Sequence, residues 1–262
     1  MAQEKSAIYQ QLKNEVRNMK FQYVCNAGIV LASEDIRIGI DCFCKDTDKL
    51  YQDTPSEVRK ELLEEIENGK LQSLIFTHEH EDHCCPEYVK EAWEKNQNLQ
   101  IYATKKVIEI LREWNMPAIN LYEIGDGDTF DVGTINVKCI QSTHEGEQYA
   151  NVQNLTLLIK KEDKYLAIIG DAKPCKQLFE KITTWSPHID WLFAPFPYVG
   201  LHSTRKLMKE ALDISHIFVL HQPRQEADTQ NWVANAKRVN ENAKDGLPKA
   251  IFPEKLGEWY LT

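Results

Sequence analysis

Short runs of apolar residues alternate with polar turns and with amphipathic stretches along the whole chain. Apolar or β-branched runs bounded by turn residues predict strands, whereas apolar residues that recur every three or four positions predict helices. The predicted strands cover residues 21–25, 28–32, 36–40, 74–76, 99–103, 121–124, 129–132, 135–140, 154–160, 165–169, 190–194 and 216–220, with two candidates in the tail at 250–252 and 259–261. The predicted helices cover residues 5–18, 55–69, 86–95, 104–114, 174–185, 203–212 and 230–243.

Strands and helices alternate up to about residue 114 and again from residue 190, which is typical of α/β proteins. Between residues 121 and 140, three short strands with turn signals between them predict hairpins instead. Pro86 should open a helix, because its missing N–H costs nothing in the first turn, and Thr104 should cap the next helix. No low-complexity linker interrupts the chain. We therefore expect a single domain over residues 1–262, with residues 1–20 as an N-terminal helical extension.

Residues able to bind metal are most concentrated in the stretch 72–86. There His78, His80, Asp82 and His83 follow directly on a predicted strand. In extended backbone, residues two apart point to the same side, so His78 and His80 can reach one cation together. Asp82 and His83 fall at the turn before the next helix, where they can face a second cation. Imidazole and carboxylate ligands without thiolate suit zinc, iron or manganese. Half of a two-metal hydrolytic centre explains this stretch better than a polar surface loop does.

Composition narrows the classes of function. The chain of 262 residues is 42% hydrophobic and has a formal net charge of −9, which argues against a general nucleic-acid binder, since phosphate neutralisation needs clustered Lys and Arg. The N-terminal residues lack the apolar core of a secretory signal, and no stretch approaches the length of a membrane-spanning helix. Seven irregularly spaced cysteines predict free thiols in a reducing, cytoplasmic setting. Cys84 and Cys85 are expected to be buried rather than to bind metal.

Residues able to bind metal recur at the ends of five predicted strands. They are Asp41, the cluster from His78 to His83, His144, Asp171 and His221. Residues at strand ends in α/β folds gather along one edge of a sheet, where ligand sites form. A single histidine such as His144 would more often be structural, so it is the repetition that indicates a site.

The order Asp41, Thr77-His78-x-His80-x-Asp82-His83, His144, Gly170-Asp171 and His221 resembles the five-motif signature of the metallo-β-lactamase superfamily over about residues 20–225. The resemblance implies an α/β fold of four layers, the αββα sandwich, in which two mixed sheets are flanked by helices. It implies two divalent metal ions at one edge between the sheets. Carried over, the first ion would be held by His78, His80 and His144. The second would be held by Asp82, His83 and His221. Asp171 would bridge the two ions, and Asp41 would support the metal-binding loops.

The resemblance also implies hydrolysis. The ions, zinc first and manganese or iron as alternatives, would lower the pKa of a bridging water. The resulting hydroxide would attack a small ester, lactone or phosphoester, while Asp82 orients it and carries its proton. Substrate contacts are expected from Tyr198, His202 and Arg205, because a phosphate or carboxylate could sit at the helix N-terminus beside them.

Within the superfamily, residues 189–195 and 219–223 are most similar to the branch that includes L-ascorbate-6-phosphate lactonase, although Phe196-Pro197-Tyr198 stands where that branch often has glycines. The alternatives are a nuclease of the same fold, a mono-iron persulfide dioxygenase, a flavodoxin-linked reductase of oxygen or nitric oxide, and a binding module without catalysis. The net charge of −9 disfavours the nuclease. His80 stands where flavodoxin-linked members usually have Glu, and the full ligand set disfavours a mere binding module. We expect a small-molecule substrate, whereas no pattern in the sequence indicates whether the chain forms a homo-oligomer.

Overall fold

The computed structural model of the chain describes residues 19–34 and 36–262, so the helix predicted for residues 5–18 lies outside the described residues. The strands are β1 (Lys20–Cys25), β2 (Gly28–Ser33), β3 (Ile36–Ile40), β4 (Leu71–Phe76), β5 (Gln100–Ala103), β6 (Leu121–Glu123), β7 (Thr129–Val132), β8 (Ile135–Thr143), β9 (Gln153–Lys161), β10 (Lys164–Ile168), β11 (Ile189–Pro195), β12 (Ile214–Leu220) and β13 (Trp259–Leu261). The helices are α2 (Ser56–Glu67), α3 (Pro86–Lys95), α4 (Lys105–Glu113), α5 (Lys176–Trp185), α6 (Pro197–Gly200), α7 (His202–Ala211) and α8 (Trp232–Asn242), and a single 3₁₀ turn covers Glu147–Tyr149.

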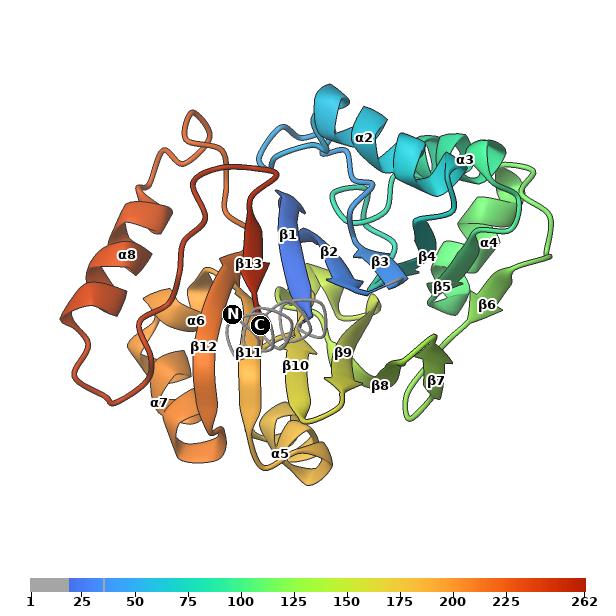
Figure 1. Cartoon of the computed structure of the whole chain (residues 1–262). Coiled ribbons are helices and arrows are strands. Elements are labelled where there is room, and N and C mark those ends of the chain that lie inside the picture. Colours follow the sequence, from blue (N-terminus) through green and yellow to red (C-terminus); the bar gives the residue numbers. More distant parts are fainter. Residues whose placement is uncertain (1–18, 35) are drawn as a thin grey trace, which may run out of the picture.

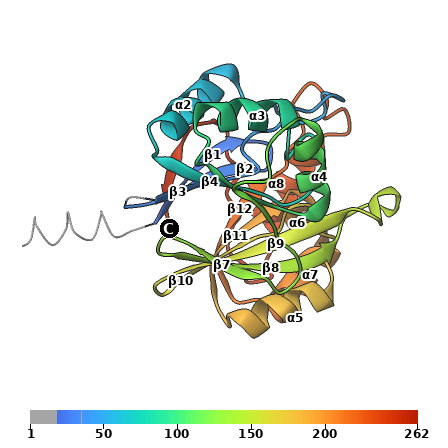
Figure 2. The same cartoon turned by 90° about the vertical axis from the view of Figure 1, so that its right-hand side faces the viewer.

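Two mixed sheets lie face to face between layers of helices (Figures 1 and 2). The first sheet has the strand order β13-β1-β2-β3-β4-β5-β6, and the second has the order β12-β11-β10-β9-β8-β7. In the first sheet β3, β4, β5 and β6 run parallel, and in the second β10, β11 and β12 do. Figure 2 shows α2 and α3 over the outer face of the first sheet and α5 over that of the second. The observed architecture is therefore the predicted αββα sandwich.

Three apolar clusters hold these four layers together. The cluster between the sheets contains Phe21 of β1 and, from the opposite sheet, Trp191, Phe193 and Phe218. A second cluster joins the first sheet to α2, α3 and α4, and a third joins the second sheet to α5, α6 and α7. Parallel strands covered on both faces read as continuous apolar runs. This explains why Leu74, Ile75 and Phe76 at the end of β4 are all fully buried.

Most local predictions are confirmed. Helix α3 begins at Pro86, and the Thr104 side chain accepts a hydrogen bond from the Val107 N–H at the start of α4. Cys84 and Cys85 are buried, and all seven cysteines are free thiols.

Two local predictions need correction, and one short helix was missed. β6 does not form a hairpin with the strands that follow it, because it pairs in parallel with β5 in the first sheet, and the chain then turns and crosses to the second sheet. The predicted strand at 250–252 is reduced to one isolated bridge between Ile251 and Phe218. The short helix α6 was not predicted, because four residues show no helical periodicity.

Phe21→Ala should destabilise the protein strongly. The Phe21 ring is fully buried and lies 5.0, 4.7 and 5.0 Å (ring centroids) from Trp191, Phe193 and Phe218 of the opposite sheet. Removing it leaves a cavity between the sheets, which should lower the free energy of unfolding by about 3–5 kcal/mol in urea denaturation. Ile119→Ala is the control, because Ile119 is 65% exposed and should change stability by less than about 0.5 kcal/mol. A loss below about 1 kcal/mol in Phe21→Ala would contradict this role for the inter-sheet cluster.

Candidate metal centre

The histidines and aspartates predicted from the strand ends meet at one edge of the two sheets. Asp41 follows β3, His78 follows β4, His144 follows β8, Asp171 follows β10 and His221 follows β12. All of these are carboxyl ends of strands. The candidate ligand atoms form three groups, each with its atoms within 4.8 Å of one another: His78, His80 and His144; His78, His83 and Asp171; and Asp82, His83 and His221.

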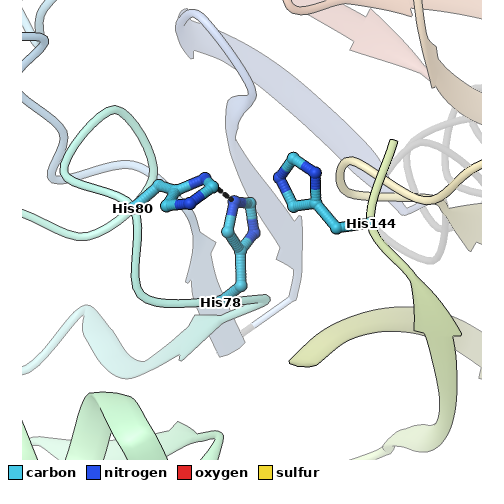
Figure 3. A group of neighbouring side chains, drawn as sticks. All are labelled: His78, His80 and His144. Atoms are coloured by element: carbon cyan, nitrogen blue, oxygen red, sulfur yellow. Dashed lines mark hydrogen bonds between the residues drawn. The ribbon is translucent and has the colours of Figure 1, made fainter. Parts of the chain in front are cut away.

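The first half of the centre consists of three imidazoles whose rings point toward one another (Figure 3). His78 and His80 come from the end of β4 and the loop after it, whereas His144 comes from the opposite sheet. The ring centroids of His78 and His144 are 4.9 Å apart, and His78 Nε2 lies 3.1 Å from His80 Nδ1. His144 Nδ1 donates to the Glu145 carbonyl oxygen over 2.6 Å. The lone pair of His144 is therefore on Nε2, which faces the centre.

The second half combines carboxylates with imidazoles. His221 Nε2 lies 3.1 Å from Oδ2 of both Asp82 and Asp171. His83 Nε2 lies 3.3 Å from Asp171 Oδ1 and 3.8 Å from Asp82 Oδ2. Asp171 Oδ2 is also 3.5 Å from His144 Nε2 of the first half. The Asp171 carboxylate therefore lies between the two halves.

Asp41 orients histidines of both halves. Its buried carboxylate accepts hydrogen bonds from the Thr77 N–H (2.9 Å) and hydroxyl (2.6 Å) and from His83 Nδ1 (2.9 Å). The Thr77 oxygen is in turn 3.1 Å from His78 Nδ1. A partner that fixes Nδ1 as the donor leaves Nε2 as the free ligand atom. Asp41 therefore presents His83 directly and His78 through Thr77.

Two buried asparagines position the carboxylates, and sequence reasoning missed both. Asn26 Nδ2 donates to the Asp82 carbonyl oxygen (2.9 Å) and carboxylate (3.2 Å), and the Asn26 carbonyl oxygen accepts from the His221 N–H. Asn154 Oδ1 accepts from the Asp171 N–H over 2.9 Å. Gly170, with φ +59°, lets this contact form, since a Cβ there would lie 2.5 Å from Asn154 Oδ1. The only signal in the sequence is a lone Asn in a turn and another in a strand, which is too weak to single out either residue.

Asp41 and His221 adopt left-handed backbone conformations, with φ of 47° and 56°. Residues other than glycine visit this region seldom and at an energetic cost. The surrounding hydrogen bonds hold both residues there, including Asp41 N–H to the Ile75 carbonyl and His221 N–H to the Asn26 carbonyl. The two left-handed residues stand where β3 and β12 end, so the strained backbone turns their side chains into the centre.

Opposite charges dominate the electrostatics of the second half. Burial alone would raise the pKa values of Asp82 and Asp171, but the neighbouring imidazoles of His83 and His221 lower both, that of Asp171 strongly. Burial alone would lower the pKa of His221, yet the carboxylates of Asp171 and Asp82 raise it to about 10. The pKa of His83 is raised well above its usual value against the same burial, by Asp171, Asp82 and Asp41.

In the first half, burial and the neighbouring imidazoles act in the same direction. Burial and His83 lower the pKa of His78 strongly, and burial and His144 lower that of His80. Both imidazoles are therefore neutral near pH 7. A neutral imidazole is the form that binds a metal ion.

Three buried polar atoms at the centre have no hydrogen-bond partner among the described residues. They are His83 Nε2, His144 Nε2 and Asp171 Oδ1. A buried polar atom without a hydrogen-bond partner is costly, and these atoms lie close together. His83 Nε2 is 3.3 Å from Asp171 Oδ1, and His144 Nε2 is 3.5 Å from the other oxygen of the same carboxylate. The donor set of imidazole nitrogen and carboxylate oxygen fits zinc, iron or manganese. The residues present therefore fit a pair of divalent ions, although they do not select one metal.

A cavity of about 600 Å³ opens above the cluster. It is lined by His80, Asp82, His144, Asp171 and His221, and by loop residues that include Tyr51, Glu145, Tyr149 and Tyr198. Of the three predicted substrate contacts, only Tyr198 lines this cavity. Its hydroxyl donates to the Ala172 carbonyl oxygen over 2.7 Å.

The other two predicted contacts lie elsewhere. Arg205 is buried in a bidentate ion pair with Asp245, with N–O distances of 2.6 and 2.9 Å. His202 is exposed at the start of α7, and it is not among the lining residues. The prediction placed both at a helix N-terminus near the last motif, but the partner of Arg205 is 40 positions further along the chain and could not be foreseen locally.

Comparison with known proteins agrees with this fold. The family model described as beta-lactamase superfamily domain matches residues 37–232, while no curated protein matches. In the part of the chain that the structure describes, no helix has the length and apolar character needed to cross a membrane.

Three solved structures illustrate the likeness of fold. The metallo-beta-lactamase fold protein YhfI from Bacillus subtilis has a TM-score of 0.66 and 16% identity, over 94% of this chain and 100% of that one. An isothiocyanate hydrolase from Delia radicum gut bacteria has a TM-score of 0.66 and 15% identity, over 93% and 100%. The diiron beta-hydroxylase CmlA from Streptomyces venezuelae has a TM-score of 0.64 and 12% identity, over 94% of this chain and 54% of that one. At these identities the likeness concerns the fold alone.

Replacing Asp41 by Asn should weaken both the fold and the centre. The amide would present an N–H to donors that now meet a carboxylate, so the metal-free protein should lose about 1–3 kcal/mol of unfolding free energy in urea. Because His83 would lose its anchor, we expect metal affinity to fall about 10- to 100-fold in competition with a chelator. Asp163→Asn, in the exposed turn after β9, is the control and should change neither quantity. Unaltered metal affinity in Asp41→Asn would contradict the anchoring role.

Metal binding should release protons. The carboxylates of Asp171 and Asp82 raise the pKa of His221 to about 10, so this imidazole carries a proton at pH 7 in the metal-free protein, and they raise the pKa of His83 in the same direction. A divalent ion must displace the proton to reach His221 Nε2, so affinity should rise with pH and about one proton or more should leave per filled centre at pH 7. Calorimetric titration with zinc in buffers of different ionisation enthalpy measures the number. Zinc binding without proton release would contradict the protonated state.

Proposed function

Because the chain belongs to the beta-lactamase superfamily and has the metallo-beta-lactamase fold, we propose that it is a metal-dependent hydrolase of a small ester, lactone or phosphoester. The proposal rests chiefly on the three orphaned ligand atoms that converge between the sheets. His78, His80 and His144 would hold one divalent ion, and Asp82, His83 and His221 the other. The Asp171 carboxylate, which is within 3.5 Å of imidazoles of both halves, would be shared.

The two ions, when bound, would supply Lewis acidity, which lowers the pKa of a coordinated water and polarises an oxygen of the substrate. The side chains of the protein orient the candidate ligands for these ions. His144 and His83 have Nδ1 committed to the Glu145 carbonyl and the Asp41 carboxylate, so in each ring Nε2 is the nitrogen that faces the centre and is left to bind an ion. Asn154 and Asn26 fix the backbone of Asp171 and Asp82. The site is thus pre-organised by contacts outside the ligand shell.

Asp82 is the group best placed to handle a proton. Its carboxylate lines the cavity, and His83 and His221 outweigh burial and lower its pKa. It is therefore ionised near neutral pH and can accept the proton of the attacking water as a general base.

Tyr51, which also lines the cavity, can assist as a hydrogen-bond donor. Its ring packs on His221 with a centroid distance of 3.9 Å. Burial, then Asp171 and Asp82, raise the pKa of its phenol, so the hydroxyl keeps its proton. A protonated phenol at the cavity wall can donate a hydrogen bond to the oxygen on which negative charge develops.

The alternatives find less support. A nuclease needs Lys and Arg to bind phosphates, and among the described residues none lines the cavity. An iron-dependent oxidoreductase would use the same donor set, and the similar fold of a diiron hydroxylase keeps that candidate in view. The lactonase-like branch stays a prediction from the sequence.

Asp171→Ala should lose at least one metal ion and all hydrolysis, because it removes the carboxylate shared by the two halves. The measurement is metal content of the purified chain by mass spectrometry, together with turnover of a panel of esters, lactones and phosphoesters. Asp163→Ala is the matched control, since Asp163 is exposed in the turn after β9. Two zinc or manganese ions per wild-type chain support hydrolysis, a single iron would support the dioxygenase, and full metal with retained turnover in Asp171→Ala would defeat the assignment.

A further inference from the structure

The walls of the cavity outside the ligand cluster carry one sign of charge. Among residues 19–34 and 36–262, the cavity has no lysine or arginine in its lining, but it has carboxylates in addition to those of the centre. Three of these, Asp48, Glu81 and Glu145, are exposed. No ion pair or side-chain hydrogen bond of theirs is formed within the described residues. These three carboxylates, called the rim below, therefore carry negative charge that no described side chain neutralises in an ion pair.

Asp46, a fourth carboxylate in the lining, is different because it builds the rim. Its two oxygens accept the backbone N–H groups of Asp48 and Tyr51, and its own N–H donates to Asp53, which pairs with Arg224. The loop that carries Asp48 and Tyr51 is thus tied down. The position of its charge is defined before a ligand arrives.

Aromatic rings form another part of the wall. Tyr51 packs on His221, and Tyr149 lies 4.8 and 4.9 Å from the rings of His80 and His144. Phe196 and Trp232, which also line the cavity, are stacked with an interplanar angle of 16°. Tyr149 and Trp232 are 39% and 46% exposed and both line the cavity, so ring surface is available there to a ligand.

We propose that this pocket takes a substrate with a flat apolar body that carries no negative charge away from the bond that is cleaved, and that it favours a substrate with a cationic group such as a protonated or quaternary amine. The inference rests on the proposed hydrolytic function and narrows its substrate class. Ring faces attract cations, and three unpaired carboxylates attract them further. A phosphate or carboxylate on the substrate would face those carboxylates without any Arg or Lys to bind it.

The test separates charge selection from metal binding. The zinc-loaded full chain is titrated calorimetrically with three benzohydroxamic acids that carry trimethylammonium, methyl or carboxylate at the para position. The hydroxamate binds the ions in the same way in all three, so differences report the wall of the pocket. We expect affinity to fall in the order cation, neutral, anion, with the cationic probe bound about tenfold or more tighter than the anionic one at low ionic strength. Added salt should reduce this ratio.

Variants assign the effect to the rim. In the double variant Glu81→Gln, Glu145→Gln, the ratio of cationic to anionic affinity should fall about threefold or more. Glu113→Gln is the control, because Glu113 is an exposed carboxylate at the end of α4, outside the lining of the cavity. Trp232→Ala should weaken all three probes, because it removes ring surface, and the cationic probe most, because ring faces attract cations.

Each outcome bears on a different claim. Equal affinities for the three probes, or tighter binding of the carboxylate, would overturn the charge selection and leave the metal centre standing. An unchanged ratio in the double variant would overturn the role of the rim carboxylates. Failure of all three hydroxamates to bind the zinc-loaded chain would overturn the metal centre, and this inference with it.

Discussion

The hydrogen bonds received by Asp41 are the interaction on which the centre depends. One buried carboxylate takes N–H and O–H donors from Thr77 and an N–H from His83, and through the Thr77 hydroxyl it also reaches His78. Without this acceptor, the rings could choose either tautomer, and their inward nitrogens would be donors as often as acceptors. The tautomers of two histidines, one from each half of the centre, are thus set by one side chain that touches neither ion site itself.

A second constraint is that the ligands come from both sheets. β3 and β4 of the first sheet carry Asp41 and His78, whereas β8, β10 and β12 of the second carry His144, Asp171 and His221. Main-chain hydrogen bonds join the sheets at this edge, from Leu155 N–H to the Thr77 carbonyl and from His221 N–H to the Asn26 carbonyl. The aromatic cluster around Phe21 holds the same two sheets together further down. The geometry of the site is therefore a property of the whole sandwich and not of one loop.

A feature could be predicted from the sequence when it depends on neighbouring residues, and not when it depends on residues far apart in the chain. An apolar run precedes each of the candidate ligands: the cluster from His78 to His83, His144, Asp171 and His221. Their placement at strand ends was therefore predictable, and the structure does bring them together. The partners of Asn26 and Asn154 are 56 and 17 positions away, and no periodicity records such a pairing. The same limit explains β6, whose three residues could pair with either neighbour, and Arg205, whose charge is neutralised by a distant aspartate. Local patterns predicted most of the elements and the gathering of the candidate ligands, but not the residues that position them.

The left-handed backbone at His221 has an evolutionary consequence. A glycine or asparagine would occupy this conformation at lower energy, so selection for stability alone would favour replacement of His221. Its side chain persists in a strained setting only while the chemistry at this edge is under selection. Asp41 differs, because its carboxylate accepts three hydrogen bonds that also stabilise the fold. In a descendant chain that had lost its catalytic role, position 221 should therefore change before position 41, toward residues that relax the turn.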